Sequence, residues 1–137
     1  MGRLAIMDEH GVPSMAPVCF VLEGQTVFLA KDDFPEGISL LREQQMDALA
    51  GNPNMALMVD HWEENLNRIG VVLMRGMGEV LPGPGLEQRR VLSLFRDKYA
   101  QYRGINMKDD PVIRMDLFSL RHWGDLSGIR PSGGEAS

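Results

Sequence analysis

Few residues of this sequence could perform covalent chemistry. Cys19 is the single cysteine, so the sequence offers no intramolecular disulfide and no paired zinc ligands. A cysteine nucleophile needs a base or a helix N-terminus to stabilise its thiolate, and nothing near Cys19 in the sequence supplies one. The adjacent Glu63 and Glu64 look like a paired acid and base, but we expect solvated carboxylates of a polar loop. We therefore predict no metal site and assign no catalytic side chain.

Basic residues form two candidate phosphate sites. Arg68 and Arg75 lie in the longest predicted strand, and an arginine that points into a cleft can bind phosphate through two parallel hydrogen bonds. Lys31 and Arg42 flank a loop and a helix start, where Ser39 and the backbone N–H groups could also receive an anion. For each of these side chains, a solvated surface position is the alternative.

Two adjacent aromatic side chains end the fourth predicted strand. His61 could donate a hydrogen bond to a ligand carbonyl, and Trp62 could stack on a planar ring. A purely structural role at a strand end is the alternative. Tyr99 and Tyr102 follow the apolar stripe of a predicted helix, so we expect them in the core.

Periodicity assigns these residues to six strands and two helices. A first helix is predicted from an N-cap at Ser39 to Gly51, and a second over residues 86–102. The fourth strand carries no charge before Asp60, which predicts burial on both faces or a subunit contact. The predicted strands cover residues 3–8, 14–22, 26–30, 55–61, 68–81 and 111–123. In the fifth of these, Gly70, Gly76 and Gly78 share one side, which favours a bend that helps to close a barrel.

Length and charge restrict the class of protein. The 137 residues predict one domain over residues 1–127 and a flexible tail over residues 128–137, which is rich in Gly, Ser and Pro. A net charge of −5 argues against nucleic-acid binding. The sequence has no apolar run long enough to cross a bilayer and no signal-peptide pattern at its start. These features predict a cytoplasmic protein that does not enter a membrane.

Five segments, in this order, are similar to a known family. The chain resembles the pyridoxamine 5'-phosphate oxidase-like, FMN-binding split β-barrels and, within them, the F420-dependent branch. The segments are RLAIMDEHGVPSMAPVCFVLEGQTVFLA (residues 3–30), LAGNPNMALMVDHWEE (49–64), MRGMGEVL (74–81), LFRDKYAQYR (94–103) and RHWGD (121–125).

This resemblance implies a fold and an activity. The fold is mainly β (α+β), a six-stranded antiparallel split β-barrel with two helices. The protein would be a homodimer with two equivalent cofactor sites at its interface, binding FMN or the deazaflavin F420. The reaction class would be hydride or electron transfer to a small-molecule substrate, which the sequence does not identify.

The same resemblance suggests cofactor contacts. Pro17, Val18 and Cys19 would lie along the isoalloxazine, where backbone groups bond the ring edge, or would simply form a barrel strand with a buried thiol. His61 or Trp62 would face the cofactor or a neighbouring loop. Trp123 would reach the cofactor of the partner subunit.

One segment departs from the family pattern. Phe34, Glu36 and Gly37 stand where basic residues commonly bind the cofactor phosphate, which leaves Lys31 and Arg42 for that role and predicts weak FMN binding. A non-catalytic flavin-binding protein, or a barrel without a cofactor, is the main alternative. A haem-binding protein is another and would use His61 or His122 as the axial ligand.

Overall fold

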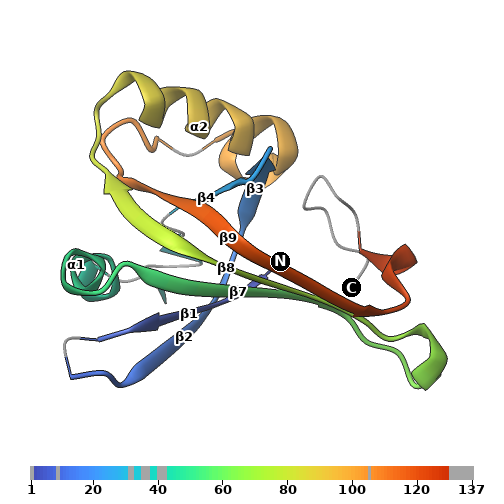
Figure 1. Cartoon of the computed structure of the whole chain (residues 1–137). Coiled ribbons are helices and arrows are strands. Elements are labelled where there is room, and N and C mark those ends of the chain that lie inside the picture. The colour runs from blue at the N-terminus through green and yellow to red at the C-terminus, as the bar shows by residue number, and fades with distance from the viewer. Residues whose placement is uncertain are drawn as a thin grey trace.

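The computed structural model describes residues 2–8, 10–30, 33–34, 38–39, 43–104 and 106–129, and only the backbone of residues 33–34, 38–39 and 43–45. Figure 1 shows the arrangement of its helices and strands. None of the described helices is long and apolar enough to span a membrane. In chain order the elements are β1 (Gly2–Met7), β2 (Pro13–Val18), β3 (Phe20–Glu23), β4 (Thr26–Ala30), β5 (Asp33–Phe34), β6 (Ile38–Ser39), α1 (Glu43–Gly51), β7 (Asn54–His61), η1 (Leu66–Arg68), β8 (Gly70–Leu81), α2 (Leu86–Lys98), η2 (Ala100–Tyr102), β9 (Val112–Gly124) and η3 (Leu126–Gly128).

Seven strands form one antiparallel sheet that curls into a barrel. The sheet order is β2-β1-β7-β8-β9-β4-β3, so β2 and β3, which follow each other in the chain, lie at opposite edges. Cys19 separates them: Val18 still pairs with Gly2 of β1, whereas Phe20 pairs with Leu29 of β4. β2 and β3 are therefore two halves of one bent strand that joins the two edges of the sheet.

The predicted fold class is confirmed, with a different strand count. The sheet is antiparallel and two α-helices accompany it, as expected. The predicted strand at residues 14–22 is divided at Cys19, and the separate β5–β6 pair was not predicted. Apolar residues continue through the division, so periodicity alone does not reveal it.

The long strands β8 and β9 bend at a β-bulge between Arg75 and Gly76. A Cβ atom at Gly76 would collide with the carbonyl of Asp116, and one at Gly78 would collide with the sulfur of Met55. Neither position can hold a side chain without local movement. The glycines that predicted a bend in this strand therefore lie where the bend occurs.

An apolar core fills the barrel, and α1 contributes to it. α1 begins at Glu43, and Ser39 lies in β6, so the predicted N-cap at Ser39 is wrong because a strand pair occupies that part of the chain. The buried core residues are Leu4, Ile6, Val18, Phe20, Val27, Leu29, Met46, Leu49, Met55, Leu57, Val59, Met74, Ile113 and Met115.

A second core lies outside the barrel, where α2 packs on β3, β4 and β9 (Figure 1). α2 ends at Lys98 rather than at residue 102, because Tyr99 is extended and η2 follows it. Tyr102 is buried, as predicted, with its ring centroid 5.3 Å from that of Phe95. The buried residues of this core are Cys19, Val21, Phe28, Ala30, Val91, Leu92, Phe95, Tyr102, Met107 and Val112.

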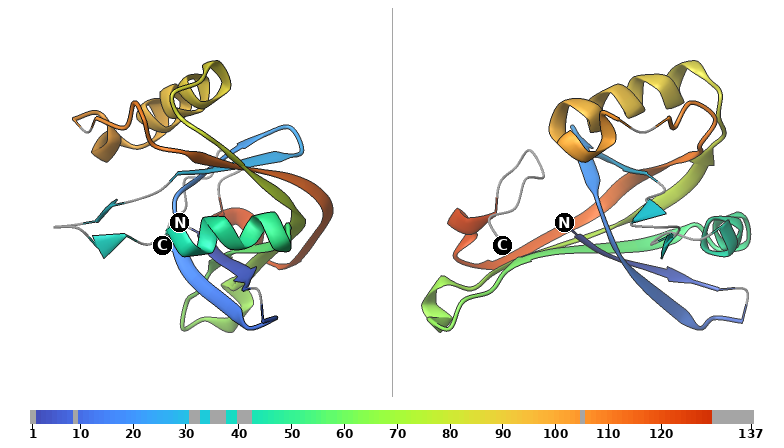
Figure 2. Two further views of the ribbon diagram at one scale, coloured as in Figure 1. Left: turned by 90° about the vertical axis from the view of Figure 1, so that its left-hand side faces the viewer. Right: turned by 180° about the vertical axis from the view of Figure 1, so that it is seen from behind.

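The rest of the outer surface of the sheet has no helix packed against it among the described residues. Figure 2 shows β7, β8 and β9 extending together beyond the barrel toward the turns that contain η1 and η3. Along β7, burial alternates, so the strand is not buried on both faces within one chain; the predicted subunit contact stays a prediction. We call this surface the open face; its outward residues are Arg3, Ala5, Met7, Pro13, Met15, Pro17, Asn54, Ala56, Met58, Asp60, Val71, Leu73, Arg75, Met77, Phe118, Ser119, Arg121 and Trp123.

Candidate functional site

The open face carries its side chains in rows that run across the strands. In one row, Met15 pairs with Ala5, Ala5 with Ala56, Ala56 with Arg75, and Arg75 with Ser119. Directly paired residues of antiparallel strands present neighbouring side chains on one face. This row therefore places the Arg75 cation beside short, mostly apolar side chains.

A hollow of about 330 Å³ opens on this row. Ala5 and Ala56 are short and leave space that longer side chains surround. Arg75 is the charged residue among the described lining, and Phe118 lines the hollow from the bulge region of β9. Pockets for small molecules start at roughly 300 Å³ and are mainly apolar with few polar groups, and this hollow matches that description.

A second arginine lies next to Arg75 on the open face. Arg121 pairs with Leu73, two residues along β8, so the two arginines are diagonal neighbours with Cα atoms roughly 7–8 Å apart. Arg3, in the same row as Leu73, is already held by an ion pair with Asp60. No described carboxylate forms an ion pair with Arg75 or Arg121. Both guanidinium groups are therefore available to an anion.

Large apolar side chains surround these arginines. The exposed fractions are 66% for Met15, 51% for Met77, 63% for Phe118 and 50% for Trp123. Single exposed apolar residues are ordinary, but several on one face are typical of a surface that contacts another molecule. The open face thus combines apolar contact area with two cations.

His61, at the end of β7, is enclosed. Its Nε2 lies 2.8 Å from Oε1 of Glu63, whose other oxygen lies 3.4 Å from Nε of Arg68. A Cβ atom at Gly128 of η3 would collide with the imidazole, so that glycine packs directly on the ring. The Nδ1 atom is buried and has no hydrogen-bond partner among the described residues. His61 would need η3 to move before it could contact a ligand.

The neighbours of His61 differ from the prediction. Glu63 was expected to be a solvated carboxylate, but it bridges His61 and Arg68, because the chain turns back through η1. Arg68 lies in η1 rather than in the strand, which begins at Gly70. Hydrogen bonds from Ser127, followed by the nearby charge of Arg68, hold the pKa of Asp125 below its usual range. This end of the sheet is held by a network of polar contacts around the Arg68–Glu63 ion pair.

The two tryptophans near this network are accessible. Trp123 pairs with Val71, which pairs with Asp60, so Trp123 lies on the open face, two rows from Arg75 by strand register. Trp62 is 67% exposed and follows the end of β7. Of these two aromatic side chains, Trp123 is the one that shares a face with the arginines.

Pro17, Val18 and Cys19 lie where the bent strand crosses from β2 to β3. Pro17 is exposed on the open face, whereas Val18 belongs to the barrel core and Cys19 to the core beneath α2. The Cys19 sulfur accepts a hydrogen bond from Nε2 of Gln101 at 3.7 Å. The side chains of Val18 and Cys19 are therefore enclosed, which leaves backbone groups for a ligand.

The other predicted phosphate site is only partly described. Lys31 and Arg42 lie outside the described residues, as do Glu36 and Gly37. Ser39 is described by its backbone alone, within β6. Of the two predicted phosphate-binding residues that the structure describes, Arg68 and Arg75, Arg75 lines the hollow on the open face.

Two features of the site were not predicted. Arg121 and Phe118 take part in the open face, but the bulge in β8–β9 changes the register, so simple alternation assigns their faces unreliably. Gly76, at the bulge, was the available signal. The enclosure of His61 depends on residues 125–128, more than 60 positions away, which no local pattern links to it.

Comparison with known proteins identifies the fold. No protein-family model matches the sequence, and no curated protein matches it. Among solved structures, the haem storage protein HutZ from Vibrio cholerae superposes with a TM-score of 0.67 and 13% identity, over 90% of this chain and 84% of that one. An FAD-binding protein from Mesorhizobium loti superposes with a TM-score of 0.64 and 16% identity, over 88% of this chain and 83% of that one. A proposed pyridoxamine 5'-phosphate oxidase from Listeria innocua superposes with a TM-score of 0.59 and 12% identity, over 90% of this chain and 88% of that one. The chain therefore has the split β-barrel fold of pyridoxamine 5'-phosphate oxidase-like proteins.

Proposed function

We propose that this protein is a flavin-dependent oxidoreductase that acts as a homodimer, with the cofactor between the open faces of two subunits. FMN is our first candidate and F420 the second. The observation that carries the proposal is that Arg75 and Arg121 form no ion pair with a described residue and lie on an apolar sheet face that no described helix covers. The fold that the chain shares with an FAD-binding protein supports it.

The open face suits a planar ring that bears a phosphate. Guanidinium groups bind phosphate oxygens in parallel pairs of hydrogen bonds, and two of them can neutralise a dianion. Trp123 and Phe118 present exposed aromatic surface on the same face. Arg75 and Arg121 would thus hold the phosphate, and the aromatic and methionine side chains would contact the ring. When bound, a flavin supplies the hydride chemistry, while the protein orients it and shields it from water.

A second copy of the chain is the simplest cover for the open face. In a twofold dimer the same patch of each subunit faces its counterpart, so one apolar face can bury another. β7 and β8 would supply much of the contact, because their outward residues form the centre of the face. Two equivalent cofactor sites would follow from the symmetry.

A titration with FMN tests the proposal. Replacing Arg75 or Arg121 with Gln removes charge-assisted hydrogen bonds worth roughly 1.5–3 kcal/mol each, so the dissociation constant should rise ten-fold or more. Arg89→Gln is the matched control, because Arg89 is exposed on α2. Calorimetry at one fixed salt concentration measures all three variants.

Two results would contradict this assignment. Equal weakening by Arg89→Gln would indicate a general effect of charge, and unchanged affinity in both other variants would place the phosphate elsewhere. No binding of FMN or F420 by the unmodified protein would favour the alternative of a barrel without a cofactor. Flavin binding without turnover of any electron donor would favour a non-catalytic flavin carrier.

Haem binding is the second candidate, because a haem storage protein shares the fold. Of the three histidines, His61 is enclosed by Glu63 and Gly128, whereas His122 is exposed on β9. His122 is therefore the candidate axial ligand. Titration with haemin should give a Soret band that His122→Ala removes and His10→Ala preserves; identical spectra for the two variants would reject this ligand.

A further inference from the structure

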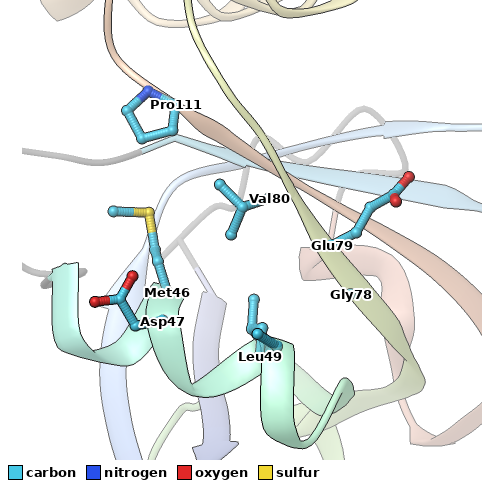
Figure 3. A pocket seen from close by; sticks show the side chains of 8 residues that line it. Met46, Asp47, Leu49, Gly78, Glu79, Val80 and Pro111 are labelled. Atoms are coloured by element: carbon cyan, nitrogen blue, oxygen red, sulfur yellow. The ribbon is translucent and has the colours of Figure 1, made fainter.

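A hollow of about 610 Å³ lies outside the open face, between α1 and β8 (Figure 3). Met46, Leu49 and Val80 give it an apolar wall, and Asp47 adds an exposed carboxylate to its lining. Its described lining residues include no thiol, imidazole or amine, so they offer no such nucleophile. A nucleophilic group that the proposed flavin site does not use lies elsewhere, at the end of α2: the amine of Lys98.

Two aromatic rings and a backbone carbonyl hold the Lys98 amine. Its Nζ atom lies 4.4 Å from the ring centroid of Phe20 in β3 and 4.7 Å from that of Tyr99. It also donates a hydrogen bond to the backbone carbonyl of Phe20, which accepts a second one from the Tyr99 hydroxyl at 3.0 Å. The Lys98 side chain is half-buried, so it is fixed in place without being sealed from solvent.

These surroundings change the charge of the amine. Burial lowers the pKa of Lys98 to about 8, while the charge of Cys19 and the faces of the two rings act in the opposite direction. Among the described residues, the titratable groups beside the amine are the Tyr99 hydroxyl and the Cys19 thiol, and no carboxylate forms an ion pair with it. At pH 7.5 about a quarter of this amine would carry no extra proton, against about a thousandth for an ordinary lysine. A desolvated lysine of this kind is an activated nucleophile.

We propose that Lys98 is a site of covalent acylation by small acyl phosphates. The amine nitrogen attacks the carbonyl carbon, the bond from that carbon to the phosphate oxygen breaks, and one amine proton passes to the released phosphate. The products are an amide at Nζ and hydrogen phosphate, and no oxidant or cofactor takes part. The remaining N–H of Nζ can still donate to the Phe20 carbonyl.

The geometry also restricts the size of the acyl group. Because the rings of Phe20 and Tyr99 already flank Nζ, a small acyl group fits there better than a bulky one. Acetyl phosphate is therefore the probe of choice. The site is separate from the open face, and the proposal does not rest on the function proposed for that face.

A comparison between lysines of the same chain tests the proposal. The chain has three lysines, and Lys108 is the internal control because it is exposed. The protein is incubated with acetyl phosphate, and mass spectrometry of its peptides gives the rate of acetylation at each lysine. A larger neutral fraction, partly offset by the weaker nucleophilicity of a less basic amine, should make Lys98 react about ten-fold faster than Lys108 at pH 7.5. The rate at Lys98 should level off above about pH 9, where the amine is already neutral.

Two further measurements show whether the folded surroundings of Lys98 cause this difference. Concentrated guanidinium chloride should bring the two rates together in the unmodified protein, because the contacts around the amine are lost. Tyr99→Ala admits water to the amine and should lower the ratio of the rates about three-fold or more, whereas Tyr99→Phe keeps the ring and should preserve the ratio. Equal rates in the folded protein, a rate at Lys98 that still rises at pH 10, or a ratio that survives denaturation would each overturn the proposal.

Discussion

The outer surface of the sheet has two halves, one that α2 covers and one on which no described helix packs. Over β3, β4 and the start of β9, α2 buries Phe28, Ala30 and Val112, and ion pairs fasten its edges: Arg90 with Glu23 at 2.9 Å and Arg114 with Glu87 at 2.9 Å. On the open face, large apolar side chains remain exposed and Arg75 and Arg121 have no described partner. The chain itself covers the first half, whereas the open face is suited to contact with another molecule.

The largest expected effect is a difference between the two halves in how much a lost aromatic ring lowers the free energy of unfolding. Phe95→Ala removes a fully buried ring beneath α2 and should lower the free energy of unfolding by about 3–5 kcal/mol. Phe118→Ala removes an equal ring from the open face, where it is 63% exposed, and should change the stability of a single chain by less than about 0.5 kcal/mol. Urea unfolding at several protein concentrations measures both. Similar losses for the two variants would mean that the halves do not differ.

The second effect concerns assembly. Met77→Asp places a charge on the β8 part of the open face and should convert the proposed dimer into a monomer, because an unpaired charge would be buried at the contact. Leu86→Asp is the control: Leu86 is also an exposed apolar residue, but it lies at the start of α2. Light scattering at micromolar concentration gives the masses. A monomeric unmodified protein, or dissociation in both variants, would contradict the proposed interface.

The third effect contrasts one aromatic residue from each half. Trp123→Ala should weaken cofactor retention about ten-fold, since a stacking contact contributes roughly 0.5–1.5 kcal/mol beyond the area that it buries. Tyr102→Ala, in the core beneath α2, should instead lower the melting temperature. Flavin fluorescence and thermal unfolding measure the two quantities. If the variants exchanged these effects, the assignment of Trp123 to the cofactor site would be wrong.

The smallest effect is a pH dependence in the covered half. Burial lowers the pKa of Lys98 to about 8, against 10.5 for an unperturbed lysine, while the charge of Cys19 acts in the opposite direction. Between these pH values the unfolded chain binds a proton that the native chain does not, so stability should rise with pH. Because Lys98 is partly exposed, the rise should be no more than about 1 kcal/mol.

Unfolding at pH 7.5 and 9.5 tests this sign. The rise should disappear in Lys98→Met and persist in Lys108→Met, which alters an exposed lysine. A fall in stability over this range that depends on Lys98 would show that its contacts with Phe20 and Tyr99 dominate over burial. Its ammonium lies 4.4 Å and 4.7 Å from the centroids of those two rings.

Local sequence patterns were sufficient to predict most of the fold. β1, β4, β7, β8 and β9 lie close to where alternation placed them, because each presents one face to the barrel core. The division at Cys19 was missed because it depends on pairing partners that are distant in sequence. The start of α1 was misplaced for a similar reason: Ser39 is a good N-cap by type, yet it pairs in β6.

The site was less predictable than the fold. Arg75 could be singled out because it is an arginine in the longest predicted strand, but the position of its neighbour Arg121 depends on register across a bulge. His61 illustrates the opposite error. Its residue type suggested a ligand, whereas Glu63 and the distant Gly128 enclose it. Residue types therefore indicated the chemistry, and only pairing between strands showed which groups are accessible.

The bent strand at Cys19 has a consequence for the order of folding. The β1–β2 and β3–β4 pairs each join neighbouring segments and can form early, but β4 completes its pairing only with β9, where Thr26 and Asp116 are 90 positions apart. Contacts this distant in sequence are slow to form, since a long loop must close first. During synthesis on the ribosome, both N-terminal strand pairs would therefore form first, and the edge of β4 would stay unpaired until β9 has emerged. During that interval the nascent chain would be most open to chaperones and to pairing with the wrong strand.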